Sequence, residues 1–80
     1  MKLPRDLSGR ELAKALRLLG YVVTREVGSH MRLTTLVRGQ HHVTIPDHAQ
    51  LRVGTLAAIL EEVGKHHQMV RADLVAKLFG

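Results

Sequence analysis

The sequence predicts an α+β protein of two layers, in which helices cover one face of a three-stranded antiparallel sheet. Apolar residues recur with helical spacing near both ends of the chain, and the middle alternates between apolar and polar residues in stretches separated by glycine-containing turns. The expected order is a helix, three strands, a helix and a short last helix. With 80 residues and 45% hydrophobic content the chain can bury one small core, so we expect a single domain over residues 1–80.

The first element is a helix that begins after Ser8. Ser8 and Glu11 have the spacing of a capping box, in which each side chain bonds to the backbone amide of the other residue. Gly20 suits the left-handed position that follows the end of a helix. The helix is amphipathic, with an apolar stripe of Leu12, Leu16 and Leu19 and a basic face of Arg10, Lys14 and Arg17.

Three strands follow this helix. Residues 21–27 and 31–37 alternate and are rich in β-branched side chains, and they meet at a turn at Gly28-Ser29. Residues 42–45 form the third strand, which ends at Pro46 because proline cannot donate to a ladder. The sheet is therefore expected to be an antiparallel meander.

The register of the second hairpin depends on the length of its loop. A three-residue loop over 39–41 sets Val37 opposite Val43 and Arg38 opposite His42, whereas a two-residue loop mixes polar and apolar side chains on both faces. We therefore expect the three-residue loop. It places on one polar face of the sheet the residues His30, Arg32, Thr34, Arg38, His42 and Thr44.

Two helices complete the chain. The second helix opens at Gly54-Thr55 and is expected to end at Gly64, and the last covers residues 71–79. Their apolar stripes are Leu56, Ile59, Leu60 and Val63 in the second helix, and Leu74, Val75, Leu78 and Phe79 in the last.

The charge of the chain indicates a polyanionic partner. Lys and Arg number 12 against 7 acidic residues, a formal net charge of +5, and six histidines add positive charge as the pH falls. Because the basic residues are spread along the chain, they indicate a folded basic surface, for which nucleic acid is the leading candidate partner. The sequence has no cysteine, no signal-peptide pattern and no stretch near the ~20 apolar residues of a membrane span, so we expect a cytoplasmic protein.

Gly28, Ser29 and His30 are the first candidates for chemistry. The glycine can take a positive φ, the hydroxyl can hold a turn or a phosphate, and the imidazole stands at the start of a strand. The same tripeptide is also typical of a solvated turn. Arg32 is the candidate phosphate partner, because it lies two residues further along the strand and on the same face.

A longer pattern surrounds this tripeptide. The chain carries in order Leu18-Leu19-Gly20-Tyr21, Gly28-Ser29-His30, Ile45-Pro46-Asp47-His48 and the run from Gly54-Thr55-Leu56 to Ile59-Leu60. This pattern, which covers nearly the whole chain, resembles the HicA (YcfA-like) toxin family. The resemblance implies a fold like that of double-stranded-RNA-binding domains, a metal-independent endoribonuclease that attacks mRNA, and a HicB-like antitoxin that covers the site. It also places the catalytic histidine at His30.

The chemistry of RNA cleavage assigns roles to the other candidates. RNA supplies its own nucleophile, so the protein needs a base, an acid and cations for the phosphate. His48 is either a second proton carrier or a structural residue of the loop into the second helix, and the second alternative is favoured. Candidate RNA contacts are Lys14 and Arg17 on the first helix, Arg38, and Thr55 at the free N-terminus of the second helix.

Neither a metal nor a cofactor is expected. The pairs His41-His42 and His66-His67 are adjacent residues whose side chains diverge, and the chain has no cysteine and no His-Glu-x-x-His pattern. Two other functions stay open at this point. The first is a non-catalytic module that binds double-stranded RNA, and the second is an element that binds only protein.

Overall fold

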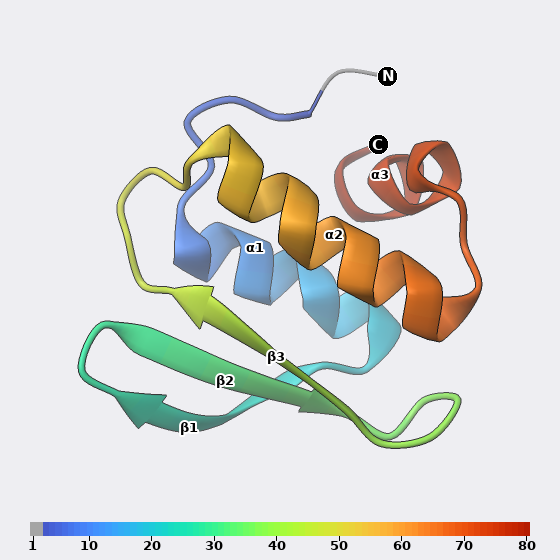
Figure 1. The fold of residues 1–80 in the computed structure, drawn as a ribbon, viewed down its shortest axis with the longest axis horizontal. Helices are drawn as coiled ribbons and strands as arrows, with labels where there is room; N and C mark the ends of the chain where they lie inside the picture. The colour runs from blue at the N-terminus through green and yellow to red at the C-terminus, as the bar shows by residue number, and fades with distance from the viewer. Residues whose placement is uncertain (1–2) are drawn as a thin grey trace.

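The computed structural model describes residues 3–80 and has the expected order of elements (Figure 1). The three strands form one antiparallel sheet in the order β1-β2-β3, and the helices lie on the same side of it. This confirms the α+β prediction, with the arrangement expected of a double-stranded-RNA-binding-domain-like fold. The elements are α1 (Gly9–Leu16), the 3₁₀ helix η1 (Arg17–Leu19), β1 (Val22–Val27), β2 (His30–Thr35), β3 (His41–Pro46), α2 (Val53–His67) and α3 (Arg71–Phe79).

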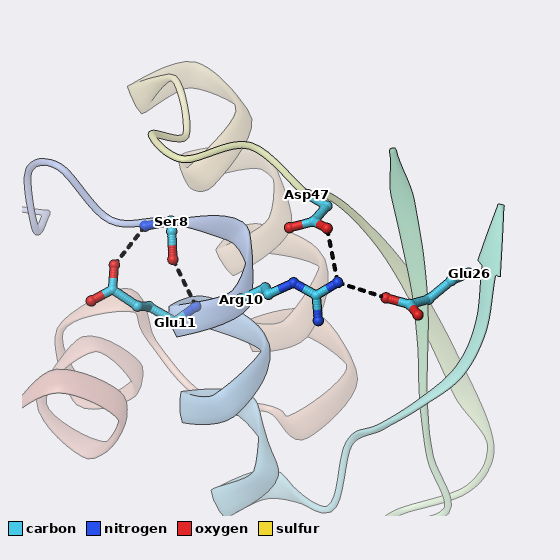
Figure 2. Close-up of polar contacts among 5 residues, drawn as sticks. All are labelled: Ser8, Arg10, Glu11, Glu26 and Asp47. Carbon is cyan, nitrogen blue, oxygen red and sulfur yellow. Dashed lines mark hydrogen bonds and ion pairs between the residues drawn. The ribbon is translucent and has the colours of Figure 1, made fainter. Parts of the chain in front are cut away.

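The predicted capping box begins α1. The Ser8 hydroxyl accepts a hydrogen bond from the Glu11 amide at 3.0 Å, and the Glu11 carboxylate accepts one from the Ser8 amide at 2.9 Å (Figure 2). These two bonds lower the pKa of Glu11 because they stabilise its charged form. The helix tightens into η1 and then stops at Gly20, whose φ of 84° is left-handed as predicted.

The N-terminus of α1 lies directly against the end of β3. The Gly9 amide donates to the His48 carbonyl oxygen at 2.9 Å, and a Cβ atom at Gly9 would overlap the carbonyl oxygen of Pro46. Only glycine therefore permits this approach of helix to strand. The contact fixes the loop that follows β3 against α1.

The first hairpin forms as expected. Val27 pairs with His30 across the two-residue turn at Gly28-Ser29, and Gly28 has a positive φ of 58°. The register then shifts between Val23 and Arg25, so β1 contains a bulge at Thr24.

The expected register of the second hairpin is wrong. Leu33, not Val37, is the partner of Val43, and Thr35 pairs with His41, so the loop covers residues 36–40 instead of 39–41. The cause is Thr35, whose buried hydroxyl donates to the Leu19 carbonyl at 2.8 Å and accepts from the Val37 amide at 3.1 Å, which turns the chain away from the ladder.

This correction moves the partner of Val43 by four residues. Because four is even, every paired side chain keeps its expected face. Arg38 is the exception. It lies in the loop with a positive φ of 59° and donates to the Gln68 side chain at 2.6 Å, so it does not belong to the polar face of the sheet.

The predicted end of the second helix is also wrong. Gly64 lies inside α2, which continues to His67, and Gln68 takes the left-handed conformation with a φ of 56°. Gly64 serves packing instead, because a Cβ there would stand 2.9 Å from the carbonyl oxygen of Met69 in the connection to α3. No helix among residues 3–80 has the length and apolar character needed to cross a membrane.

The hydrophobic core lies between the helices and the inner face of the sheet. Its most deeply buried side chains come from the three α-helices, from β2 and β3, and from the residue before β1: Leu12, Leu16, Tyr21, Met31, Leu33, Ile45, Leu56, Leu60, Val63 and Leu74. Every helix lies on this inner side (Figure 1). The opposite, outer face of the sheet is therefore not covered by any helix of the described chain.

Candidate active site

His30 lies on this outer face, as the first residue of β2. It pairs with Val27 of β1 and with Pro46 of β3, so backbone ladders hold it on both sides. The next residue of the strand points the other way, since Met31 is buried in the core while His30 is exposed. The imidazole is therefore presented to solvent from a fixed backbone.

A shallow hollow surrounds His30. It has a volume of about 220 Å³ and is lined by Arg25, Val27, His30, Arg32 and Thr44, with no acidic residue among them. Arg25 and Arg32 are direct partners across the β1–β2 ladder, and neither forms an ion pair with any residue in the described part of the chain. Like charges in this position repel each other. An anion bound between them would relieve that repulsion.

Arg25 did not enter the candidate set drawn from the sequence. The signal for it was present, because a two-residue turn that pairs Val27 with His30 necessarily pairs Arg25 with Arg32. The prediction assigned faces only to the second and third strands. Pairing the first strand with the second, residue by residue, identifies Arg25 as the neighbour of Arg32.

The turn that carries His30 is held from the inner side. The Asp47 amide donates to the Ser29 carbonyl oxygen at 2.6 Å. Figure 2 shows the Arg10 guanidinium between two carboxylates, with its Nη2 atom 2.9 Å from Asp47 Oδ2 and 3.1 Å from Glu26 Oε1. The hydrogen bond and charge of Asp47 raise the pKa of Arg10 above its ordinary value. Since the pairs are exposed, they position these segments more than they stabilise the fold.

A chain of hydroxyl groups crosses the outer face beside the hollow. Thr24 and Thr34 are 2.8 Å apart at their Oγ1 atoms, and Thr34 Oγ1 lies 2.8 Å from Nδ1 of His42. The bulge at Thr24 brings this residue to the same face as Thr34. The expected polar face is therefore present for His30, Arg32, Thr34, His42 and Thr44.

The other predicted RNA contacts do not lie in the hollow. Lys14 and Arg17 are exposed on α1 and η1, which lie on the opposite side of the sheet. Arg38 is bound to Gln68. Thr55 lines another groove of about 660 Å³, which shares Thr44 with the hollow. Two glutamates, Glu61 and Glu62, also line this groove.

His48 has a structural role through its backbone. Its carbonyl oxygen accepts the hydrogen bond from Gly9, and its side chain is exposed in the loop after β3.

A second group of titratable side chains lies at the other end of the sheet. The buried Tyr21 hydroxyl is 2.7 Å from His41 Nδ1 and 3.1 Å from His67 Nε2, and the His41 ring stacks on His66 with centroids 4.4 Å apart. His66 Nε2 donates to the carbonyl oxygens of Val37 and Gly39. The side chains of His41 and His42 diverge as predicted, since one contacts Tyr21 and the other Thr34. The same prediction is wrong for His66 and His67, whose rings meet edge to face with centroids 4.8 Å apart.

In this histidine cluster, which consists of Tyr21, His41, His66 and His67, the pKa values of Tyr21, His41 and His67 are shifted. Burial raises the pKa of Tyr21 to about 12, since the phenolate is the charged form. Burial, with the positive charge of His66 as a smaller cause, lowers the pKa of His41 and of His67. Among residues 3–80 no group of three or more His, Cys, Asp or Glu side chains is arranged to hold a metal ion.

Comparison with known proteins agrees with this arrangement. The family model described as the HicA toxin of bacterial toxin-antitoxin matches residues 9–65, from the start of α1 to the last turns of α2. No curated protein and no solved structure matched the chain. The matched segment covers well over half of the sequence and includes the whole sheet with His30. The chain belongs to the HicA toxin family of bacterial toxin-antitoxin systems.

Proposed function

We propose that this toxin is an endoribonuclease that cleaves mRNA in the cytoplasm without a metal ion, with His30 as its catalytic residue. The observation that carries the proposal is the placement of an exposed imidazole in a hollow between two arginines, Arg25 and Arg32, on an open sheet face. Membership of a toxin family supplies the biological context, since an enzyme that destroys mRNA stops growth.

The reaction is a transphosphorylation within RNA. The 2′-oxygen forms a bond to the adjacent phosphorus and loses its proton, while the bond from phosphorus to the 5′-oxygen breaks and that oxygen gains a proton. Neutral His30 can accept the first proton, or protonated His30 can donate the second. Because RNA provides the nucleophile, one positioned imidazole is sufficient for a modest rate.

Arg25 and Arg32 stabilise the phosphate during the reaction. A guanidinium donates charge-assisted hydrogen bonds to phosphate oxygens, and two of them on adjacent strands approach the same phosphate from two sides. Gly28 and Ser29 support the site by presenting His30 at the end of the hairpin, and the Ser29 hydroxyl is a further donor for the RNA backbone. We place His48 as the candidate partner for the other proton, and Lys14, Arg17, Arg38 and Thr55 as outer RNA contacts.

The test is cleavage of a defined RNA by the purified toxin and its His30→Ala and His30→Gln variants. Loss of one general acid or base lowers the rate by about 10² to 10⁴-fold. His42→Gln is the matched control, because it removes an imidazole from the same face outside the hollow. Addition of EDTA should leave the wild-type rate unchanged.

Two outcomes would contradict the proposal. Full activity of both His30 variants would show that another group performs the chemistry. Binding of RNA by the wild-type toxin without any cleavage, even at high protein concentration and long incubation, would instead identify a non-catalytic module that binds double-stranded RNA.

A further inference from the structure

The outer face of the sheet has an apolar half as well as a basic one. An open groove of about 480 Å³ lies at the end of β2 away from His30, and it is lined by Gly20, Val22, Thr24, Thr34, Leu36 and Val37. Thr34 is four residues from His30 along the strand, so these two residues are about 14 Å apart at ~3.4 Å per residue.

Large aliphatic side chains are exposed around this groove. Leu36 is 76% exposed, Val22 55% and Val37 47%. Val37 is held in place by local structure, because its amide donates to the Thr35 hydroxyl. Its side chain also packs closely against Gly20, where a Cβ atom would stand only 2.7 Å from Val37 Cγ2. Contiguous exposed aliphatic groups of this kind on a small protein mark a surface that binds another molecule.

The groove does not suit RNA. Proteins hold unpaired bases by stacking them on aromatic or guanidinium planes, and none of the residues that line the groove is aromatic or charged. Aliphatic walls with a polar rim are typical of the centre of a protein interface. The rim here is the Thr24–Thr34–His42 chain of hydrogen bonds.

The charges beside the groove specify what kind of protein fits. The outer face carries Arg25, Arg32, His30 and His42, and its strand positions include no acidic residue within the described chain, because Glu26 pairs with buried Met31 on the inner side. A complementary partner therefore places carboxylates over Arg25 and Arg32 in the hollow. It also places aliphatic side chains over Leu36 and Val37 in the groove.

We propose that the groove is the anchor of the toxin's antitoxin, which inserts aliphatic side chains between Val22 and Leu36 and extends an acidic segment over Arg25 and Arg32. The partner follows from membership of a toxin-antitoxin family. The inference rests on the proposed function in that the acidic segment occupies the place of the RNA phosphates. The anchor itself lies outside the catalytic hollow, so binding and catalysis can be separated by mutation.

The experiment uses the full toxin and the protein encoded by the adjacent reading frame as the probe. Leu36→Ser removes the most exposed aliphatic side chain of the groove without touching the core, and Val70→Ser, at a 66% exposed valine on the helical side, is the matched control. We expect Leu36→Ser to weaken the complex by at least about tenfold in calorimetry, as for an interface hot spot, and Val70→Ser to leave its Kd unchanged.

RNA cleavage by the same variants distinguishes the partner. Leu36→Ser should cut RNA at the wild-type rate while the antitoxin no longer neutralises it fully. If Leu36→Ser instead loses RNA cleavage, the groove is part of the RNA site and the inference is wrong. An unchanged Kd for Leu36→Ser, or no complex with the wild-type toxin, also overturns it. Failure of the proposed function has a different signature, because a wild-type toxin without RNase activity can still be tested for complex formation.

Discussion

The Asp47 amide donates a hydrogen bond to the Ser29 carbonyl oxygen, with 2.6 Å between the two atoms. This bond ties the turn that precedes His30 to the loop after β3, and the same loop is tied to α1 through Gly9 and Arg10. The position of the His30 imidazole therefore depends on the helical layer, although His30 lies on the face of the sheet that no helix covers.

Gly9→Ala tests this dependence. A Cβ at position 9 overlaps the Pro46 carbonyl oxygen, so the start of α1 must move away from β3. We expect a loss of roughly 1–3 kcal/mol in the free energy of unfolding, measured in urea, and slower RNA cleavage at a temperature where the variant is folded. Gly54→Ala is the control, since a Cβ there meets no atom within 4 Å, and its stability should be unchanged or higher. Equal stability of the two variants would contradict the close contact at Gly9.

Arg25→Gln tests the residue that the sequence did not bring forward. Loss of a charge-assisted hydrogen bond to phosphate costs roughly 1.5–3 kcal/mol, so kcat/KM for RNA should fall about 10- to 160-fold. The measurement is initial rates of cleavage over a range of salt concentrations, and the salt dependence should weaken because one phosphate contact is lost. Arg71→Gln on α3 removes the same charge far from the sheet face and should have little effect. Similar losses in both variants would indicate a general effect of net charge.

The histidine cluster predicts a dependence of stability on pH. The pKa values of His41 and His67 are lowered in the folded protein, mainly by burial and further by the positive charge of His66, with Arg38 beside His67 acting in the same direction and Glu62 opposing it at His41. At low pH the unfolded chain therefore binds more protons. Stability should be complete above the unfolded pKa near ~6.5 and decrease as the pH falls from there through the lowered folded values. Urea unfolding between pH 5 and pH 8 measures it, and a flat profile would be inconsistent with lowered pKa values of His41 and His67 in the folded protein.

Tyr21→Phe tests the hydrogen bonds at the centre of the cluster. The tyrosine hydroxyl has one hydrogen, so in the neutral cluster one imidazole accepts it and the other donates to the oxygen. Removing the hydroxyl leaves both ring nitrogens without that partner, and we expect a loss of about 1–3 kcal/mol in the free energy of unfolding at pH 7. At high pH the difference should narrow. The stability that neutral Tyr21 contributes to the wild type is lost as the pH rises from ~10 through its folded pKa of about 12. Phenylalanine does not ionise, so the variant has no such loss.

The fold class and the order of elements were contained in local patterns of the sequence. Helical spacing of leucines, the Ser8–Glu11 capping box and the two-residue turn at Gly28 depend on residues close together in the chain, and all of them are present in the structure. His30 could be placed on an exposed strand position for the same reason, because side chains alternate along any strand. Its part in catalysis remains a proposal that rests on the hollow around it.

Only the tertiary structure decided the features that depend on distant residues. The hydroxyl of Thr35 ends β2 early because it bonds to Leu19 in η1, and Gly64 continues α2 because the connection to α3 packs against it. In the same way, Tyr21 gathers histidines from β3 and from the end of α2, and the antiparallel ladder sets Arg25 beside Arg32. Each of these outcomes follows from a contact across the fold, whose energy outweighs the local preference that the sequence displays.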